Sequence, residues 1–469
     1  MLKNLTRRKF VQGSMAASLA AASAPSFSLP KVNTQNVPPL NIDKQKRALV
    51  CIMLDGGNDS FNMLVPHSAK HYSEYAKTRA NLALAKDSLL PLQGFADKEG
   101  REFALHPSMP EVAELFGQEK LSFVANIAPL IEPVNKQAFL DRSARVPLGL
   151  LSHADQFKHW QTSRPDLRVQ QGWFGYFADA LQLDKKADQI PMNISLAGSN
   201  IMQNGQRSTH YSITGSGSVG LVVNEEESDL NRAILRSFET VLNTSYAGDP
   251  FKQSYLSITR EAQLQHRKYR DAVEKISLPI EFSDNDLSKQ LAKVAQSIAA
   301  AEELGLPQQT YFLRYIGWDH HDDLLNSLAR MLRVLSKAMG EFQQAIDLLG
   351  LSENVLCFTG SDFGRTLTSN GNGSDHGWGG HCMVMGDAVK GGQVLGDYPA
   401  LSLGDKNPLD VGGGVLIPTL PTDVLFAQLS MWFGVQESDV PKLFPNLKNF
   451  AADSANGEDW PRLDLLNNS

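Results

Sequence analysis

Short, continuously apolar runs alternate along the chain with longer stretches that place apolar residues at helical spacing. Runs of the first kind are typical of strands buried on both faces of a parallel sheet. They lie at residues 48–54, 121–127, 311–316, 355–359 and 382–386. Helical spacing is seen at residues 110–119, 324–349 and 421–433. This alternation predicts an α/β fold with a mostly parallel sheet and helices on both faces.

The middle of the chain interrupts this pattern. Residues 199–278 are more polar and rich in helix-forming residues, with turn signals at Asn204-Gly205 and Ser216-Gly217. We expect this stretch to be an insertion or cap on one α/β domain that spans residues 45–465.

The N-terminus carries the features of an export signal. A basic Arg7-Arg8 pair precedes an Ala-rich stretch at 11–24, which ends in the small-x-small sequence Ala22-Ser23-Ala24. The apolar run is too short and too rich in serine for a membrane span. We therefore predict a twin-arginine signal peptide over residues 1–30, export by the twin-arginine translocase to the periplasm or beyond, and no integral membrane segment after cleavage.

The net charge of the chain narrows the class of partner that it can bind. The formal net charge is -7, and residues 1–24 hold four basic residues and no acid, so the chain without them carries -7 - 4 = -11. That sign argues against nucleic acid or an anionic membrane as the main partner.

The three cysteines, Cys51, Cys357 and Cys382, lie in apolar runs, which indicates core thiols rather than a disulfide framework.

Three acids follow predicted strands directly. Asp55, Asp319 and Asp362 each stand at or just after the end of an apolar run, with glycine close by. Ligands of open α/β sheets bind beyond the carboxyl ends of the strands, so these three side chains are expected at one edge. A single such Asp is often only a helix N-cap or a turn former, and the prediction depends on the coincidence of all three.

Histidines accompany two of these acids. His320 and His321 follow Asp319, and His376 and His381 follow Asp362. Mixed Asp and His ligands suit Zn²⁺, Mn²⁺ or Fe, whereas a carboxylate-rich set also accepts Mg²⁺ or Ca²⁺. The pattern predicts a divalent metal site and leaves the metal open.

Several separated segments resemble, in order, the motifs of a bacterial family of proteins called domain of unknown function 1501. They are Leu54–Pro66 (LDGGNDSFNMLVP), Leu105–Pro107 (LHP), Ser152–Gln156 (SHADQ), Gly317–His321 (GWDHH), Ser361–Thr366 (SDFGRT) and Asp375–Gly380 (DHGWGG). The family is similar in fold to the alkaline phosphatase and sulfatase superfamily. The resemblance implies metal ligands at Asp55, Asp319, His321, Asp362 and His376.

The chain departs from the superfamily at one position. Phe363 follows Asp362, where the superfamily usually has histidine, so one ligand of a two-metal site is missing. A single metal is one interpretation. Replacement of the missing ligand by His320 or His381 is the other.

The resemblance leaves the nucleophile open. In the superfamily it lies at a helix N-terminus after the first strand, where free N–H groups bind a phosphate or sulfate. Here Ser60, His106 and Ser108 are candidates, and Ser108 is also a natural N-cap. Arg365 is a candidate anion clamp, with pairing to a nearby acid as its alternative role. The chain lacks the Cys-x-Pro-x-Arg sequence, which argues against a formylglycine sulfatase.

Two function classes follow. The first is an exported, metal-dependent hydrolase of phosphate or sulfate esters, acting on a small-molecule or polymer substrate. The second is a non-catalytic secreted binding protein that keeps a phosphatase-like fold and a structural metal.

Overall fold

The computed structural model describes residues 40–181, 189–218, 228–245, 248–451 and 460–467. The predicted signal peptide at 1–30 lies outside these residues. All described residues belong to one compact unit, and within them no helix is long and apolar enough to cross a membrane.

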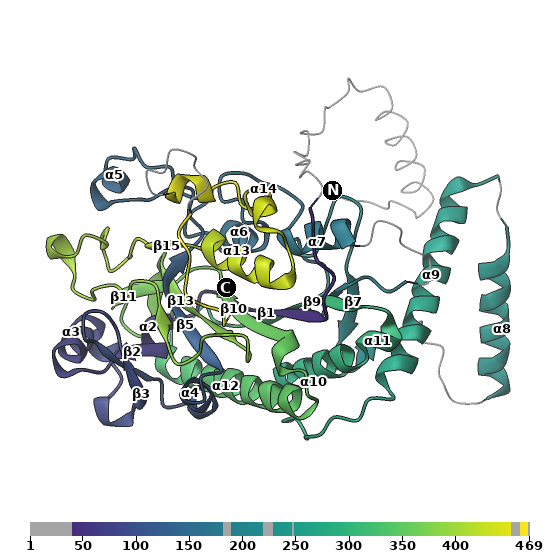
Figure 1. The fold of residues 1–469 in the computed structure, drawn as a ribbon, viewed down its shortest axis with the longest axis horizontal. Coiled ribbons are helices and arrows are strands. Elements are labelled where there is room, and N and C mark those ends of the chain that lie inside the picture. Colours follow the sequence, from purple (N-terminus) through teal and green to yellow (C-terminus); the bar gives the residue numbers. More distant parts are fainter. Residues whose placement is uncertain (1–39, 182–188, 219–227, 246–247, 452–459, 468–469) are drawn as a thin grey trace, which may run out of the picture. The chain divides into compact units, whose positions relative to one another are not determined.

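A ten-stranded sheet forms the centre of this unit (Figure 1). Its middle strand is β1 (Arg47–Asp55), which pairs in parallel with β9 (Gln308–Ile316) on one side and β10 (Val355–Ser361) on the other. Residues 48–54 of β1 are buried, as expected for an apolar strand covered on both faces. These three strands were predicted at nearly the same positions.

The sheet continues beyond both neighbours of β1. Past β10 come β13 (Gly380–Met385) and β5 (Leu121–Ala128), and β13 pairs antiparallel with both β10 and β5. Beyond them, β14 (Val394–Leu395) and β15 (Leu420–Pro421) pair in parallel with β5. Past β9 come β6 (Asn193–Ser195), β7 (Tyr211–Thr214) and β8 (Gly217–Ser218). Most pairings are parallel, which confirms the predicted fold class.

Helices cover both faces of the sheet (Figure 1). On one face lie α4 (Pro110–Gly117), α10 (Asp286–Ala299) and α12 (Leu324–Leu348). On the other lie α6 (His153–Thr162), α7 (Trp173–Leu181) and α13 (Thr422–Phe433). The three cysteines are buried and free, as predicted.

The stretch predicted as an insertion is more than a cap. Residues 199–278 supply β7 and β8 to the main sheet, and they also contain α8 (Asp229–Asn243) and α9 (Pro250–Val273). The division of the chain into a main domain and an insertion stays a prediction.

Strand register brings the predicted acids to one edge. Leu54 lies opposite Ser361, and Asp55 lies opposite Ile316, so the segments that follow β1, β9 and β10 leave the sheet side by side. Gly56 has φ of +123°, and a Cβ on it would lie 2.6 Å from the Asp319 backbone nitrogen. Only glycine therefore allows the turn after β1 to lie against the loop after β9.

A two-stranded hairpin completes this edge. It consists of β11 (Arg365–Ser369) and β12 (Ser374–His376), in which Arg365 lies opposite His376. The hairpin follows β10 after a short loop, so it carries both residues to the carboxyl end of the central strands.

Candidate metal centre

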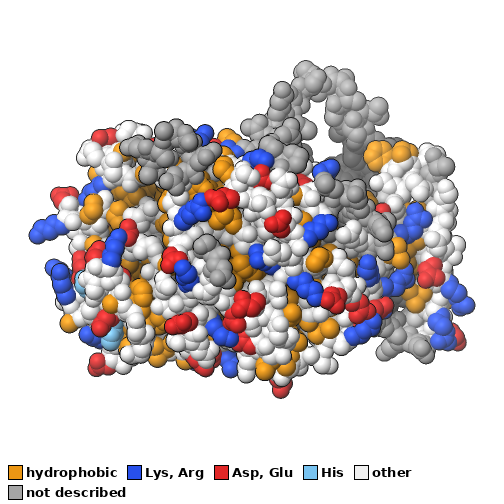
Figure 2. Space-filling model, in the orientation of Figure 1, with side chains coloured by type: hydrophobic (Ala, Val, Ile, Leu, Met, Phe, Trp, Pro, Cys, Tyr) orange, Lys and Arg blue, Asp and Glu red, His pale blue; other side chains and the backbone are white. Residues whose placement is uncertain are grey.

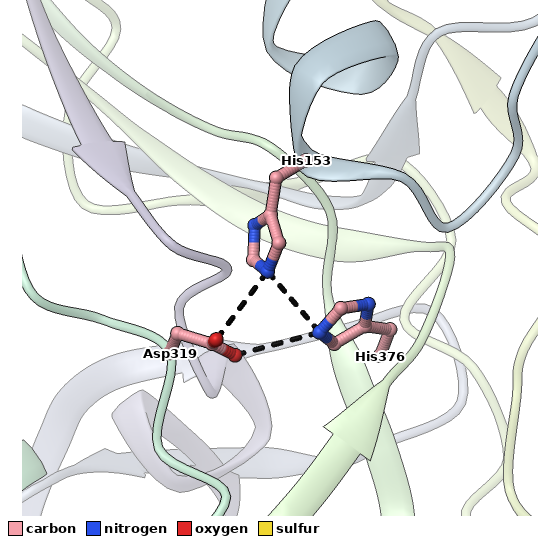
Figure 3. Close-up of side chains that lie close together, drawn as sticks. All are labelled: His153, Asp319 and His376. Carbon is pink, nitrogen blue, oxygen red and sulfur yellow. Dashed lines mark hydrogen bonds and ion pairs between the residues drawn. The ribbon is translucent and has the colours of Figure 1, made fainter. Parts of the chain in front are cut away.

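Three side chains from different parts of the fold point at one another beyond the strand ends (Figure 3). His153 is the first residue of α6, Asp319 lies in the loop after β9, and His376 ends β12. The two His Nε2 atoms lie 3.1 Å apart. Asp319 places Oδ2 3.5 Å from the Nε2 of His153 and Oδ1 3.4 Å from the Nε2 of His376.

A third histidine extends this group. The Nε2 of His321 lies 3.0 Å from the Nε2 of His376 and 3.0 Å from the Oδ1 of Asp319. We call His153, Asp319, His321 and His376 the histidine cluster. Three of its four members were predicted as metal ligands.

Hydrogen bonds hold the far side of every ring. The Nδ1 of His153 lies 2.8 Å from the Oδ2 of Asp362, and the Nδ1 of His376 lies 2.8 Å from the backbone oxygen of Leu151. The Nδ1 of His321 lies 3.1 Å from the Oδ1 of Asp375. Carbonyl and ionised carboxylate oxygens only accept hydrogen bonds, so each Nδ1 carries the hydrogen and each Nε2 carries a lone pair.

The donor atoms of the cluster consequently face one another without a hydrogen between them. Lone pairs and a carboxylate at 3.0–3.5 Å repel unless a cation lies among them. Tetrahedral ligands with bonds of about 2.0–2.1 Å stand roughly 3.3–3.4 Å apart. His153, Asp319 and His376 match that spacing and form a group able to hold a metal ion, so the residues present fit a divalent cation.

The cluster is open to solvent on one side. The side chains of Asp319 and His321 are each 43% exposed. Burial alone would raise the pKa of Asp319, but the hydrogen bond and charge of Arg365 lower it below its usual range. Burial lowers the pKa of His376. Both shifts keep the donor atoms unprotonated, as metal binding requires.

The other two strand-end acids lie around the cluster. The Oδ2 of Asp362 accepts from the backbone nitrogen of Gly56 at 3.2 Å besides its contact with His153. Its Oδ1 is buried and has no hydrogen-bond partner among the described residues. Burial, together with the charge of Asp55, raises the pKa of Asp362 to about 6. Asp55 itself pairs with Arg314, whose Nε lies 2.9 Å from its Oδ2. Ligand roles for Asp55 and Asp362 stay predictions.

Arg365 pairs with an acid, which was the alternative to its role as an anion clamp. It is buried, and its Nη1 lies 2.7 Å from the Oδ1 of Asp319. The guanidinium also donates to the backbone oxygen of Ser374. Arg365 thereby holds the carboxylate of Asp319 in place within the cluster.

The predicted nucleophiles are buried. The Oγ of Ser60 accepts from the backbone nitrogen of His381 at 2.9 Å. The Nδ1 of His106 accepts from the backbone nitrogen of Ser108 at 3.0 Å, and burial lowers the pKa of His106 to about 4. No hydrogen bond within the described residues joins Ser60, His106 or Ser108 to the histidine cluster.

Neither alternative ligand lies in the cluster. The Nδ1 of His381 accepts from the backbone nitrogen of Asn126 at 3.0 Å, and burial lowers the pKa of His381 to about 3. His320 is buried, and neither ring nitrogen has a hydrogen-bond partner among the described residues.

His153 is the member that sequence reasoning did not assign. It begins a helix instead of following a strand, so the strand-end argument could not reach it. The signal that could have found it is the SHADQ segment, where it stands as the histidine.

The fold and the histidine cluster define an α/β protein with a candidate metal centre at the carboxyl ends of its parallel strands. The chain belongs to the protein family of unknown function DUF1501, whose model matches residues 46–412. This match confirms the family resemblance seen in the motifs. No curated protein matches the sequence.

The chain is similar, at low identity, to several solved structures. Ps i-CgsB shares 11% identity over 87% of this chain and 78% of its own, with a TM-score of 0.34. The C-terminal periplasmic domain of EcEptC from Escherichia coli shares 12% over 91% and 95%, with a TM-score of 0.34. Alkaline phosphatase from Thermus thermophilus shares 11% over 72% and 64%, with a TM-score of 0.25.

Proposed function

We propose that the protein is an exported, metal-dependent hydrolase of phosphate or sulfate esters, with the histidine cluster as its metal centre. The observation that carries this proposal is the convergence of three Nε2 atoms, each fixed by a hydrogen bond at Nδ1, on the carboxylate of Asp319. Such second-sphere hydrogen bonds set the tautomer and direction of metal-binding histidines.

The donor set favours particular metals. Nitrogen-rich sites with one carboxylate suit Zn²⁺ or Mn²⁺ better than Mg²⁺ or Ca²⁺, which prefer oxygen. A divalent metal supplies a Lewis acid that polarises an ester oxygen and lowers the pKa of water.

The residues of the chain divide the remaining work. Asp362 and the Leu151 carbonyl orient His153 and His376, and Arg365 holds Asp319 in place. His321 lies at the solvent side with its Nδ1 held by Asp375. It would supply a third nitrogen donor or, if the other three donors suffice, a base at the solvent side of the cluster.

Ester chemistry and export are supported by the sequence. The strand-end acids and the two histidines match motif positions that the superfamily resemblance gives to phosphate and sulfate ester hydrolysis. The twin-arginine sequence within residues 1–30 supports a periplasmic or extracellular location.

A second candidate is a secreted binding protein with a structural metal. It is favoured by the burial of Ser60, His106 and Ser108, none of which is hydrogen-bonded to the cluster within the described residues. In that case the metal would stabilise the strand ends and no nucleophile would be needed.

Metal content of the purified mature protein, measured by mass spectrometry, tests the site. We expect close to one divalent metal per chain, lost in His153→Ala and His376→Ala. His67→Ala is the matched control, because His67 lies outside the cluster, and it should keep the metal. A folded protein that binds no metal after reconstitution with Zn²⁺ and Mn²⁺ would sink the metallohydrolase.

Removal of the metal then separates the two candidates. The chelated protein is assayed by circular dichroism and on nitrophenyl phosphate, bis-nitrophenyl phosphate and nitrophenyl sulfate. Loss of turnover with the fold intact supports the hydrolase. Unfolding, together with no turnover by the metal-loaded protein on any ester, supports the binding protein.

A further inference from the structure

Helices α8 and α9 expose most of the large apolar side chains found at the surface. Of the thirteen exposed large hydrophobic residues among the described ones, eight lie on these two helices. They are Leu230, Ile234, Leu235, Val241, Phe251, Tyr255, Ile258 and Leu264. We call them the α8–α9 surface.

Six of these residues follow helical spacing, whereas Leu235 and Leu264 lie off the two stripes. On α9, Phe251, Tyr255 and Ile258 stand at positions i, i+4 and i+7, which places them on one stripe. Phe251 is 87% exposed and Tyr255 is 70% exposed. On α8, Leu230 and Ile234 repeat the i, i+4 spacing. Figure 2 shows hydrophobic side chains gathered at the upper end of α9.

Both helices have capped N-termini although few of their residues are buried. Ser228 caps α8 through the backbone nitrogen of Asn231, and Asp249 caps α9 through that of Lys252. Leu242 is the only buried residue of α8. In α9, burial is concentrated in the second half, where Tyr269 packs against Tyr211. An amphipathic helix gains most of its stability by burying its apolar face, so an exposed stripe on a capped helix indicates a missing partner.

We propose that the α8–α9 surface is the interface through which two copies of this chain form a symmetric dimer. The first argument is area. The eight side chains expose on the order of 800 Å² of apolar surface, which is about what each partner buries in a standard protein interface.

Charge selects a second copy over a lipid surface. Residues 228–273 carry seven Lys or Arg and five Asp or Glu, so both signs are interspersed along the pair of helices. A helix that lies on an anionic bilayer has a predominantly basic polar face. Mixed signs around an apolar stripe suit a two-fold interface, in which each acidic position of one copy can meet a basic position of the other. Pairing of two helical hairpins would give a four-helix bundle.

Mass in solution tests the dimer. The mature wild-type chain should have twice its monomer mass by light scattering after size exclusion at micromolar concentration. Phe251→Asp/Tyr255→Asp should have the monomer mass with an unchanged far-ultraviolet spectrum. Leu348→Asp is the control, because Leu348 is an exposed apolar residue at the end of α12, outside the α8–α9 surface, and this variant should stay dimeric.

Cross-linking locates the interface. The three native cysteines are buried, so Tyr255→Cys would present the one accessible thiol. Mild oxidation should give a disulfide-linked dimer of Tyr255→Cys and none of Leu348→Cys. The proposal is overturned if the wild-type chain is monomeric at about 50 μM, which is well above ordinary dimer dissociation constants. Sedimentation of that monomer with phosphatidylglycerol vesicles would assign the surface to lipid instead.

Discussion

Two polar groups of the molecule each contain an aspartate but arrange their hydrogen-bond donors and acceptors in opposite ways. Asp59, Asn62, Tyr75 and Arg79, which we call the arginine network, are fully buried. Each guanidinium nitrogen of Arg79 donates to an acceptor: Nη2 to Asp59, Nε to Asn62 at 3.2 Å, and Nη1 to the backbone oxygen of Thr366 at 2.9 Å. In the histidine cluster, acceptors face acceptors.

The difference teaches how to tell a structural group from a binding group. In the arginine network every guanidinium nitrogen meets an acceptor, and the one side-chain atom of its members left without a hydrogen-bond partner among the described residues is the Oδ1 of Asp59. In the histidine cluster, hydrogen bonds at the far side of each ring hold lone pairs 3.0–3.1 Å apart, an arrangement that could hold a metal ion. Complementarity of donors and acceptors is thus more informative than burial or charge alone.

The largest effect is expected from the arginine network. Arg79→Leu leaves Asp59 buried without its cation and should lower the free energy of unfolding by about 3–5 kcal/mol. Metal content per folded molecule should not change. Urea unfolding followed by circular dichroism, with metal analysis of the folded fraction, measures both.

Two controls accompany this variant. Lys46→Met removes an exposed ion pair with Glu302 and should change stability by no more than about 1 kcal/mol. Adding Asp59→Asn to Arg79→Leu should recover part of the loss, because no charge is then left unpaired. Loss of metal from folded Arg79→Leu would contradict the separation of the two groups.

Asp423 in the first turn of α13 is a buried acid that forms no ion pair among the described residues, although the charge of Arg164 acts on it. Its Oδ1 accepts a hydrogen bond from the hydroxyl of Ser163, and burial raises its pKa from the ordinary 3.8 to about 7. Between these values the unfolded chain loses the proton while the folded chain keeps it, so folding is weakened as pH rises. From pH 4.5 to 8 this costs roughly 3 kcal/mol of stability.

Asp423→Asn isolates that contribution. The variant should be more stable relative to wild type at pH 8 than at pH 4.5, measured as the difference in unfolding free energy at each pH. Other titrating groups, including those of the histidine cluster, cancel in that difference. A difference that is the same at both pH values would show that Asp423 ionises normally.

The sequence predicted the edge on which the site lies better than the residues that form it. Parallel pairing of β1 with β9 and β10 follows from their apolar runs, so Asp55, Asp319 and Asp362 were correctly expected at one edge. The role of each acid depends on its partner. Arg314 pairs with Asp55, and His153 hydrogen-bonds to Asp362. Those partners come from other elements, and spacing along the chain does not reveal them.

The direction of each histidine is also a tertiary property. His320 and His321 are adjacent in sequence, yet His320 is buried away from the cluster and His321 is part of it. Backbone geometry after β9 decides between them. The α8–α9 surface was equally hidden, because helical spacing of apolar residues predicts a buried face and does not say what buries it.

Asp362→Asn tests the hydrogen bond behind the cluster. The amide oxygen can still accept from Gly56 and His153, so the fold should be kept. Loss of the negative charge makes the Nε2 of His153 a weaker metal ligand, so metal affinity should fall by about 10–100-fold. Competition with a chromogenic chelator measures the affinity, and an unchanged value would remove Asp362 from the site.

Asp375→Asn is the matched comparison and should have the smallest effect. Asp375 holds the Nδ1 of His321 at 3.1 Å in the same way that Asp362 holds His153, but it is largely exposed, whereas Asp362 is fully buried. Water can replace an exposed acceptor, so the loss of affinity should be within about 1 kcal/mol, or roughly five-fold. Equal losses in Asp362→Asn and Asp375→Asn would mean that burial does not set the strength of these hydrogen bonds. A larger loss in Asp375→Asn would make His321, rather than His153, the histidine on which metal binding chiefly depends.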